Sequence, residues 1–360
     1  MAKTAGIVGA GLIGRILALR LIREGWNVTI FDKDDTGGRK SCGFIAGGML
    51  SLYSEAEIIG DLVVQLGQKS IILWPEILSF LGVESYLRVL GSVIVAHASD
   101  LSDLERVCFM VRRRFPEIFS DLCITDNICE LVPGLSVSHG VHIKGEGDID
   151  SMRLFRSLET ALKSLGAIWR SHTAVREVSP GKIVGDEGSC HFDFVFDCRG
   201  IGARCDIEGL RGVRGEVILV RAPGVTIEFP TRMMHPRYSI YVVPRPDNTF
   251  LIGSTEIESC DFSEISVQSV LEMLSAAYSL HRGFAEARVL DMMTGCRPAF
   301  SDNLPRLFVG EGIMRINGLY RYGYLAAPAM VEEVMLYLKG SCGDYPALYR
   351  SLKSEQEACF

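Results

Sequence analysis

The sequence predicts an α/β protein in which a domain built on a βαβ unit is interleaved with a second domain built on an antiparallel sheet. Residues 5–32 follow the order strand, glycine-rich turn, helix, strand, acidic residue. Strand patterns at 174–196 return the chain to the sheet of this unit, whereas residues 213–256 are rich in strands of a different sheet. The predicted domains are 1–85 with 140–205 and 300–345, and 86–139 with 206–299.

Composition excludes several classes of protein. A length of 360 residues suits two domains, and 48% hydrophobic with 22% charged residues is typical of a globular chain. The net charge of −7 disfavours a nucleic-acid partner, which usually meets a basic surface. No apolar run in the sequence reaches the length of a membrane span, so no transmembrane segment is expected.

The cysteines and histidines give no sign of a metal site. The eleven cysteines form no CxxC pair, and the seven histidines lack the spacing of metal ligands. An odd number of cysteines in a large chain favours reduced thiols and a cytoplasmic protein. Glycines at 6, 9, 11 and 14 interrupt the apolar N-terminal stretch, which we interpret as part of the fold rather than as a signal peptide.

The first forty residues carry the fingerprint of a Rossmann-like, dinucleotide-binding unit. Its parts are a buried strand over 5–8, GAGLIG over 9–14, a helix over 12–24 and a strand over 27–31. Gly9 permits the tight turn, Gly11 lets a pyrophosphate approach, and Gly14 lets the helix pack on the strand. Asp32 suits a ribose diol and disfavours the 2′-phosphate of NADP. The fingerprint alone leaves NAD and FAD open.

The remaining elements follow from hydrophobic periodicity and from turn residues. A glycine-rich loop covers 37–43. Helical character is expected to begin at 46–50, where small residues permit a second close approach to a ligand. Helices are expected over 58–82, 100–114, 150–165, 266–280 and 328–338. Strands are expected over 87–96, 174–178, 182–184, 192–196, 216–220, 238–243, 250–253, 287–293, 306–309 and 313–317.

Six short sequence motifs occur along the chain, and their order and spacing identify a protein family more specifically than any single motif does. They are the fingerprint, AGGML at 46–50, EGDID at 146–150, YVVPR at 241–245, GCRP at 295–298 and LYRYGYLAAP at 319–328. Over nearly its whole length, the chain resembles the glycine oxidase branch of the D-amino-acid oxidase family of flavoenzymes, of the kind used in thiamine biosynthesis. The resemblance implies FAD, the two-domain fold of that family, and oxidation of an amine beside a carboxylate.

The resemblance also implies a substrate site at Arg297, Arg321 and Tyr241. A guanidinium binds a carboxylate through two parallel hydrogen bonds, so Arg297 is expected to anchor the substrate carboxylate. Arg321 is expected to be the second site arginine, and Tyr241 to close over the substrate. A surface salt bridge for Arg297, a purely structural or flavin contact for Arg321 and plain sheet packing for Tyr241 stay open.

The FAD contacts are implied in the same way. Leu12 and Ile13 are expected beside the pyrophosphate, Asp32 and Lys33 near the adenosine ribose, Val175 at the adenine, and 319–325 near the isoalloxazine. The full set is Gly9, Gly11, Leu12, Ile13, Gly14, Asp32, Lys33, Lys40, Ser41, Gly47, Gly48, Met49, Val175, Gly200, Tyr320, Tyr322, Gly323, Tyr324 and Leu325.

Four residues depart from the family pattern or need a separate interpretation. Arg199 is expected either to contact FAD or to cap its strand. Phe44 and Tyr53 flank the flavin loop and are expected to narrow or reshape the pocket, which leaves the substrate open. Cys296 is expected to be a buried, unreactive thiol rather than a covalent link to the flavin.

The implied reaction is oxidative deamination. A hydride passes from Cα of a neutral amine to flavin N5, the imine hydrolyses to a 2-oxo acid and ammonia, and dioxygen takes the electrons to give hydrogen peroxide. No side-chain base is needed for the C–H step. The open alternatives are a dehydrogenase using another acceptor, a tailoring oxidase of a larger amine, an NAD-dependent reductase and a non-catalytic nucleotide-binding protein. A homo-oligomer is also left open.

Overall fold

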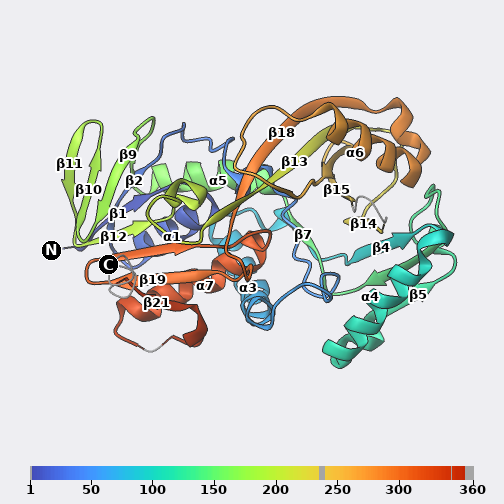
Figure 1. The fold of residues 1–360 in the computed structure, drawn as a ribbon, viewed down its shortest axis with the longest axis horizontal. Helices are drawn as coiled ribbons and strands as arrows, with labels where there is room; N and C mark the ends of the chain where they lie inside the picture. The colour runs from blue at the N-terminus through green and yellow to red at the C-terminus, as the bar shows by residue number, and fades with distance from the viewer. Residues whose placement is uncertain (1, 235–239, 342, 353–360) are drawn as a thin grey trace.

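Two large β-sheets lie toward opposite ends of the long axis of the molecule, and helices pack around the first of them (Figure 1). The computed structural model describes residues 2–234, 240–341 and 343–352. Of the residues considered above, His235, Tyr238, Cys342 and Cys359 lie outside these ranges, and the strand predicted at 238–243 is described from residue 240. Across the described ranges, no helix is long and apolar enough to cross a membrane.

The first sheet is mostly parallel and contains the fingerprint strands. Its order is β21 (Tyr349–Ser351), β19 (Arg306–Gly310), β20 (Ile313–Asn317), β12 (Phe194–Asp197), β1 (Thr4–Val8), β2 (Asn27–Phe31) and β8 (Ile168–Arg170). Neighbouring strands run parallel except β19 and β20. Successive side chains of a strand face opposite sides, so Ile7 joins the core under the helices and Val8 joins the core on the other face.

Helices cover one face of this sheet and a small meander covers the other. The helices are α1 (Leu12–Arg23), α3 (Asp61–Phe80), α5 (Ser151–Ser164) and α7 (Gly323–Leu338). α1 contacts α5 and α7, and α7 contacts α3. The meander consists of β9 (Val175–Ser179), β10 (Lys182–Gly185) and β11 (Gly188–His191). Val178 and Ile183 of the meander pack in one cluster with Val8.

The meander corrects one part of the sequence analysis. The strands predicted at 174–178 and 182–184 do not rejoin the parallel sheet. Of the three strands predicted between 174 and 196, only the last joins it, as β12 beside β1. Val175 therefore lies in the meander, not in the nucleotide-binding sheet. β8 at the edge of the parallel sheet was not predicted. A meander strand and an edge strand carry the same alternating pattern, so periodicity alone does not assign a strand to a sheet.

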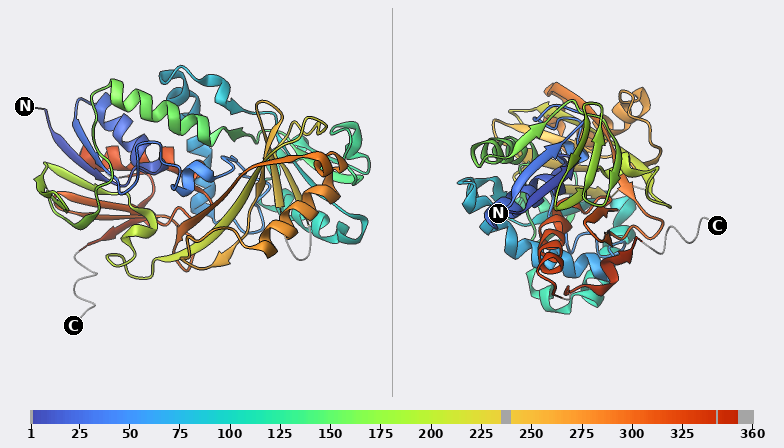
Figure 2. Two further views of the ribbon diagram at one scale, coloured as in Figure 1. Left: turned by 90° about the horizontal axis from the view of Figure 1, so that it is seen from above. Right: turned by 90° about the vertical axis from the view of Figure 1, so that its left-hand side faces the viewer.

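The second sheet is antiparallel except where β14 and β4 run parallel. Its order is β17 (Ile257–Glu258), β13 (Arg211–Arg221), β16 (Thr249–Gly253), β15 (Ile240–Arg245), β14 (Thr231–Met234), β4 (Ser92–Ala96), β6 (His139–Ile143) and β5 (Leu122–Thr125), with β18 (Arg288–Ala299) also paired to β13. The long strands β13 and β18 run from the middle of the molecule into this sheet (Figure 2). β6 includes residues 140–143, which the domain boundaries predicted from the sequence assign to the first domain. The division of the chain into two domains stays a prediction.

The two faces of the second sheet have different roles. α6 (Val267–Leu280) covers one face, where Met273 and Ala277 pack in one core with Val242. Tyr241 and Val243 point the other way, into the core shared with the first sheet. The shorter elements are α2 (Cys42–Ile45), α4 (Leu101–Arg114), β3 (Leu87–Arg88) and β7 (Asp148–Ile149). The 3₁₀ helices cover Glu84–Tyr86, Ala98–Asp100, Pro116–Asp121, Ile128–Glu130, Gly200–Ala203, Arg282–Glu286 and Pro346–Leu348.

α7 begins at Gly323 rather than at the predicted Pro328, which lies inside the helix. A proline favours the first turn of a helix because it has no N–H to donate to the carbonyl four residues earlier. That carbonyl belongs to Tyr324, and the indole Nε1 of Trp74 in α3 donates to it at 2.8 Å. The donor from the neighbouring helix therefore lets α7 pass through Pro328 without a buried, unpaired carbonyl.

Trp74→Phe should destabilise the protein by about 1–3 kcal/mol, because the buried carbonyl of Tyr324 loses its donor. In a Pro328→Ala background the loss should be smaller, since residue 328 then has an N–H for the same carbonyl. Chemical denaturation of the four proteins of this double-mutant cycle measures the difference. Equal losses in both backgrounds would contradict this explanation of α7.

Candidate functional site

The three fingerprint glycines differ in what surrounds them. Gly9 and Gly14 are required by the packing of the protein itself, whereas Gly11 borders open space. Gly9 has a φ of +101°, and a Cβ there would lie 2.5 Å from the carbonyl oxygen of Cys198. A Cβ at Gly14 would lie 2.0 Å from the carbonyl oxygen of Gly9. At Gly11 a Cβ would meet only the Ser41 hydroxyl, at 3.4 Å. The space beside Gly11 is therefore available to a ligand.

The N-terminus of α1 is suited to an anion. Its N-cap residue, Gly11, makes no side-chain cap hydrogen bond, and the first turn contains no acidic residue. Its N–H groups and the positive end of the helix dipole thus face the space beside Gly11. Asp32 directly follows the carboxyl end of β2. Its carboxylate accepts hydrogen bonds from the N–H of Ala10 at 2.6 Å and of Asp34 at 2.9 Å.

The sequence analysis missed Arg15, which holds the fingerprint loop in place. Arg15 is fully buried, and its guanidinium donates to the carbonyl oxygens of Ala10 at 2.7 Å, Thr36 at 2.6 Å and Phe155 at 3.3 Å. Burial lowers the pKa of Arg15 to about 10. The signal in the sequence was an arginine on the buried side of an otherwise apolar helix. Its role could not be predicted, because its carbonyl partners come from three separate segments.

Several other predicted cofactor contacts are spread out around the end of the first sheet. Lys33 and Lys40 are exposed, and Lys40 pairs with Asp34 at 3.2 Å. Val175 is half-buried and packs against the cluster that contains Phe31, next to Asp32. Gly200 follows β12 with a φ of +56°.

Arg199 binds carboxylates of the protein rather than facing a ligand site. Its guanidinium donates to both carboxylate oxygens of Asp197, at 2.9 and 2.6 Å, and also pairs with Asp206. Of the two interpretations left open for Arg199, this geometry favours a cap of the strand.

The loop at 46–50 is fixed at the other end of the site. Gly48 has a φ of +63°, and a Cβ there would lie 2.0 Å from the carbonyl oxygen of Ile149. Arg245 donates to the carbonyl of Gly47 at 2.7 Å and to Asp148 at 2.7 Å, which ties the loop to β7 and β15. This segment is an ordered turn and a single bridge between Met49 and Asp148. The helical character expected after residue 46 is therefore wrong.

A cavity opens where this loop meets the second sheet. Its empty volume is about 760 Å³ and is continuous with the solvent. Of the predicted site residues, it brings together Arg297, Arg321, Tyr241, Gly47, Gly48, Met49, Tyr322, Tyr324 and Leu325. The lining residues that the sequence analysis did not assign to the site are Cys42, Ile45, Ala46, Ser51, Glu55, Gly215, Val217, Ser254 and Gly295. The three residues expected at the substrate thus share one cavity.

Phe44 and Tyr53 do not line this cavity. The ring of Phe44 packs edge-on against Phe155, with centroids 5.7 Å apart, and Tyr53 packs in the same manner against Phe115, at 5.1 Å. The expectation that these two rings narrow the pocket is wrong, because each ring finds a partner in the core behind the loop.

Arg297 lies within β18, opposite Val213 of β13, rather than after the strand as expected. Its guanidinium donates to the carbonyl oxygen of Thr255 at 3.1 Å and to the hydroxyl of Ser254. Gly215 makes room for it, since a Cβ at Gly215 would lie 2.6 Å from the guanidinium. Among the described residues no carboxylate forms an ion pair with Arg297. Glu256 interacts with it electrostatically but is paired with Arg321 instead.

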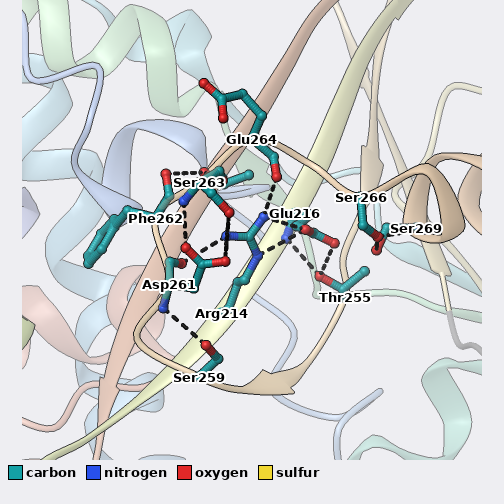
Figure 3. A network of polar contacts seen from close by, with 11 residues as sticks. Arg214, Glu216, Thr255, Ser259, Asp261, Phe262, Ser263, Glu264, Ser266 and Ser269 are labelled. Carbon is teal, nitrogen blue, oxygen red and sulfur yellow. Dashed lines mark hydrogen bonds and ion pairs between the residues drawn. The ribbon is translucent and has the colours of Figure 1, made fainter.

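A buried ion pair on β13 fixes the segment that holds Arg297 (Figure 3). Glu216 accepts two hydrogen bonds from Arg214, at 2.9 and 2.7 Å, and a third from the Thr255 hydroxyl at 3.1 Å. The N–H of Glu216 in turn donates to the Thr255 hydroxyl at 2.9 Å. Thr255 is thereby held between Glu216 and Arg297.

The same arginine anchors the chain on the far side of the strand. Arg214 also donates to the carbonyl oxygens of Asp261 at 2.9 Å and Glu264 at 2.7 Å (Figure 3). Burial raises the pKa of Glu216, but hydrogen bonds from Ser269 and Arg214 outweigh it, and the net pKa is lowered. Glu216 thus stays ionised as the anchor of Thr255.

Arg321 differs from Arg297 because it has acidic partners. It pairs with Glu55 at 3.0 Å and with Glu256 at 3.3 Å. The hydroxyl of Tyr320 also donates to Glu256, and burial together with this carboxylate raises the pKa of Tyr320 to about 12. Arg321 therefore contributes little unbalanced charge to the cavity.

Cys296 faces away from the cavity that Arg297 lines. Its Sγ donates to the carbonyl oxygen of Ser259 at 3.4 Å, and burial raises its pKa to about 12. A protonated thiol on the far side of the strand is a poor nucleophile, which favours the unreactive interpretation. In the described residues no group of three or more His, Cys, Asp or Glu side chains is placed to hold a metal ion.

Comparisons with known proteins give a consistent result. A family model for FAD dependent oxidoreductases, of the D-amino-acid oxidase (DAO) type, matches residues 5–335. The chain is 35% identical over 328 residues to a Rhizobium etli protein described as a candidate thiamine biosynthesis oxidoreductase, ThiO, covering 91% of this chain and 93% of that one. It is 27% identical over 344 residues to the glycine oxidase of Geobacillus kaustophilus, covering 89% of each chain.

The fold agrees with the sequence comparison. The crystal structure of glycine oxidase from Geobacillus kaustophilus matches with a TM-score of 0.83 and 25% identity, covering 97% of this chain and 98% of that one. The crystal structure of iminodiacetate oxidase from Chelativorans sp. BNC1 has the same TM-score at 21% identity, which supports the fold alone. The fold and the FAD cofactor expected from the resemblance are confirmed.

The described residues fit FAD. The uncapped N-terminus of α1 and the space beside Gly11 can take the pyrophosphate, and Asp32 can accept hydrogen bonds from the ribose. The cavity beside Gly47 and Tyr324 can take the ring system. Ser41 lies beside Gly11 and the next residue, Cys42, lines the cavity, so the two places adjoin.

The fingerprint glycines give a test that separates folding from cofactor binding. Gly11→Ala should leave the stability of the apoprotein within about 0.5 kcal/mol of wild type but weaken FAD binding at least roughly tenfold, since the methyl group occupies the pyrophosphate space. Gly14→Ala should lower the stability of the apoprotein itself, because its Cβ meets the carbonyl of Gly9. Thermal unfolding and flavin titration measure both; full FAD affinity in Gly11→Ala would contradict the assignment.

Proposed function

Because the chain belongs to the D-amino-acid oxidase family of FAD-dependent oxidoreductases, and is itself such an oxidoreductase, we propose that it deaminates a small amino acid by oxidation. Glycine is the substrate proposed first, in line with relatives named glycine oxidase. The proposed products are an imine, which water converts to a 2-oxo acid and ammonia, and hydrogen peroxide formed from dioxygen as the electron acceptor.

The unpaired guanidinium of Arg297 is the observation that carries this proposal. It faces the cavity, bonded only to a carbonyl and a hydroxyl, and forms no ion pair within the described residues. A positive charge partly withdrawn from water is strongly stabilised by an anion, and a carboxylate matches the guanidinium fork. An amino acid brings that anion, whereas a simple amine does not.

The residues of this chain then position the substrate. Arg297 holds the carboxylate, Tyr241 lies across the cavity wall beside Gly47, and the hydroxyl of Tyr241 comes near Gly253. FAD, when bound, supplies the redox chemistry by accepting a hydride from the substrate Cα. The protein contributes orientation and exclusion of water, so no catalytic base among its side chains is required.

The cofactor would be held by the residues expected from the sequence. The pyrophosphate and ribose belong in this proposal to Gly11, Leu12, Ile13 and Asp32, and the ring system to the cavity-lining residues at 47–49 and 322–325. Lys33 and Val175 belong in this proposal to the adenosine end, and Lys40 and Ser41 are further proposed contacts.

Three further statements belong to the proposal. The similarity to ThiO proteins suggests that the glycine imine is used in thiamine biosynthesis, where thiazole assembly consumes it. The described cysteines are free thiols, which supports a cytoplasmic location. The two sheets support two domains, the first near 1–85, 140–205 and 300–345 and the second near 86–139 and 206–299, with β6 assigned to the second.

Anaerobic mixing of the FAD-loaded protein with glycine, sarcosine, D-proline and D-alanine tests the proposal. Loss of the visible flavin absorbance with glycine, and its return with hydrogen peroxide on admitting air, is the expected result. Bleaching that reverses only with an artificial acceptor would favour a dehydrogenase, and bleaching only by larger amines would favour a tailoring oxidase. No bleaching by any amine would overturn the proposal.

Arg297→Gln should raise KM for carboxylate-bearing substrates roughly 100-fold, because a charge-assisted bidentate pair of about 3 kcal/mol is lost. Arg288→Gln is the matched control, since Arg288 lies on the same strand with its side chain 73% exposed and should leave KM unchanged. Steady-state kinetics at equal FAD occupancy makes the comparison. Equal KM values in the two variants would refute the role of Arg297.

A further inference from the structure

Glu55 lines the cavity, and one oxygen of its carboxylate has no partner in the described part of the chain. The Glu55 side chain is 5% exposed, and its Oε1 is 3.0 Å from Arg321 and 3.9 Å from Arg232. Its Oε2 is buried and accepts no hydrogen bond from the described residues. A buried carboxylate oxygen without a donor is unfavourable, so a group that binds in the cavity and brings a donor would be stabilised there.

The backbone around Glu55 is held rigidly. Glu146 is fully buried and accepts hydrogen bonds from the N–H groups of Tyr53, at 2.5 Å, and Ser54, at 2.7 Å. The hydroxyl of Ser92 also donates to Glu146. These bonds fix the two residues that precede Glu55 to the motif at 146–150. The carboxylate is thus positioned before any ligand arrives.

Glu55 and Arg297 line the same cavity, but one is a hydrogen-bond acceptor and the other a hydrogen-bond donor. Arg297 offers donors and a net positive charge, whereas Glu55 offers an acceptor whose charge is largely offset by Arg321. An α-amino acid carries an acceptor and a donor on one carbon atom, namely its carboxylate and its amine. The two side chains therefore match the two polar groups of one small molecule.

We propose that Glu55 is the residue that recognises the substrate amine, with Oε2 accepting one of its N–H groups while Arg297 holds the carboxylate. This inference rests on the proposed function and assigns the second half of substrate recognition. Because Arg321 offsets the charge of Glu55, the acceptor does not demand an ammonium ion and suits the neutral amine that gives up a hydride. The favoured class is amino acids with at least one amine N–H, which excludes fully N-substituted ones.

Glu55→Gln tests this role. Arg321 requires an oxygen, so the amide NH₂ is left facing the amine and cannot accept a hydrogen bond from its N–H. KM for glycine should rise roughly tenfold or more, whereas the Kd of acetate, which has no amine, should stay equal or fall because a negative charge is gone. Glu55→Asp keeps an acceptor and should lie between wild type and Glu55→Gln. Acetate binding is followed by the change in flavin absorbance.

Glu256→Gln is the matched control, since Glu256 also pairs with Arg321 but does not line the cavity. It should change glycine and acetate affinity by the same factor. FAD content and thermal unfolding verify that each variant is folded. If glycine reduces the wild-type protein but the KM for glycine is unchanged in folded Glu55→Gln and Glu55→Asp, this inference is overturned and the proposed function stays intact. A wild-type protein that no amine reduces would overturn both.

Discussion

The site depends on the guanidinium of Arg297, which is oriented by a carbonyl and a hydroxyl and has no ion-pair partner within the described residues. The carbonyl of Thr255 and the hydroxyl of Ser254 orient Arg297, and Gly215 leaves it the space of a missing side chain. Each of these contacts fixes direction without neutralising charge. The anion is thereby left to a ligand, and the neighbouring Arg321, balanced by two carboxylates, does not compete for it.

The fold explains why such a group can be held so firmly. Arg297 stands on a long strand of the second sheet, and the pair of Arg214 with Glu216 on the adjoining strand locks the segment that faces it. A buried ion pair is weak evidence for stability, but its several hydrogen bonds define one geometry. The loop around Gly47, tied down by Arg245, brings the cofactor half of the molecule to the same cavity.

Local patterns in the sequence predicted the fingerprint, since Gly9, Gly14 and their strand and helix are neighbours along the chain. The gathering of Arg297, Arg321 and Tyr241 rested on resemblance, because no spacing reveals contacts between distant segments. Residues such as Arg15 and Glu55 were missed for the same reason. The start of α7 was missed because the donor that compensates for its internal proline lies on another helix, and the meander strands were misassigned because alternation does not specify a sheet.

A crystal structure of the FAD-loaded protein with bound glycolate, a carboxylate that the enzyme cannot deaminate, tests the central claim most directly. The account predicts both carboxylate oxygens about 3 Å from the guanidinium nitrogens of Arg297, with the flavin ring in the cavity beside Gly47. A glycolate carboxylate bound elsewhere, with Arg297 still bonded only to Thr255 and Ser254, would contradict it.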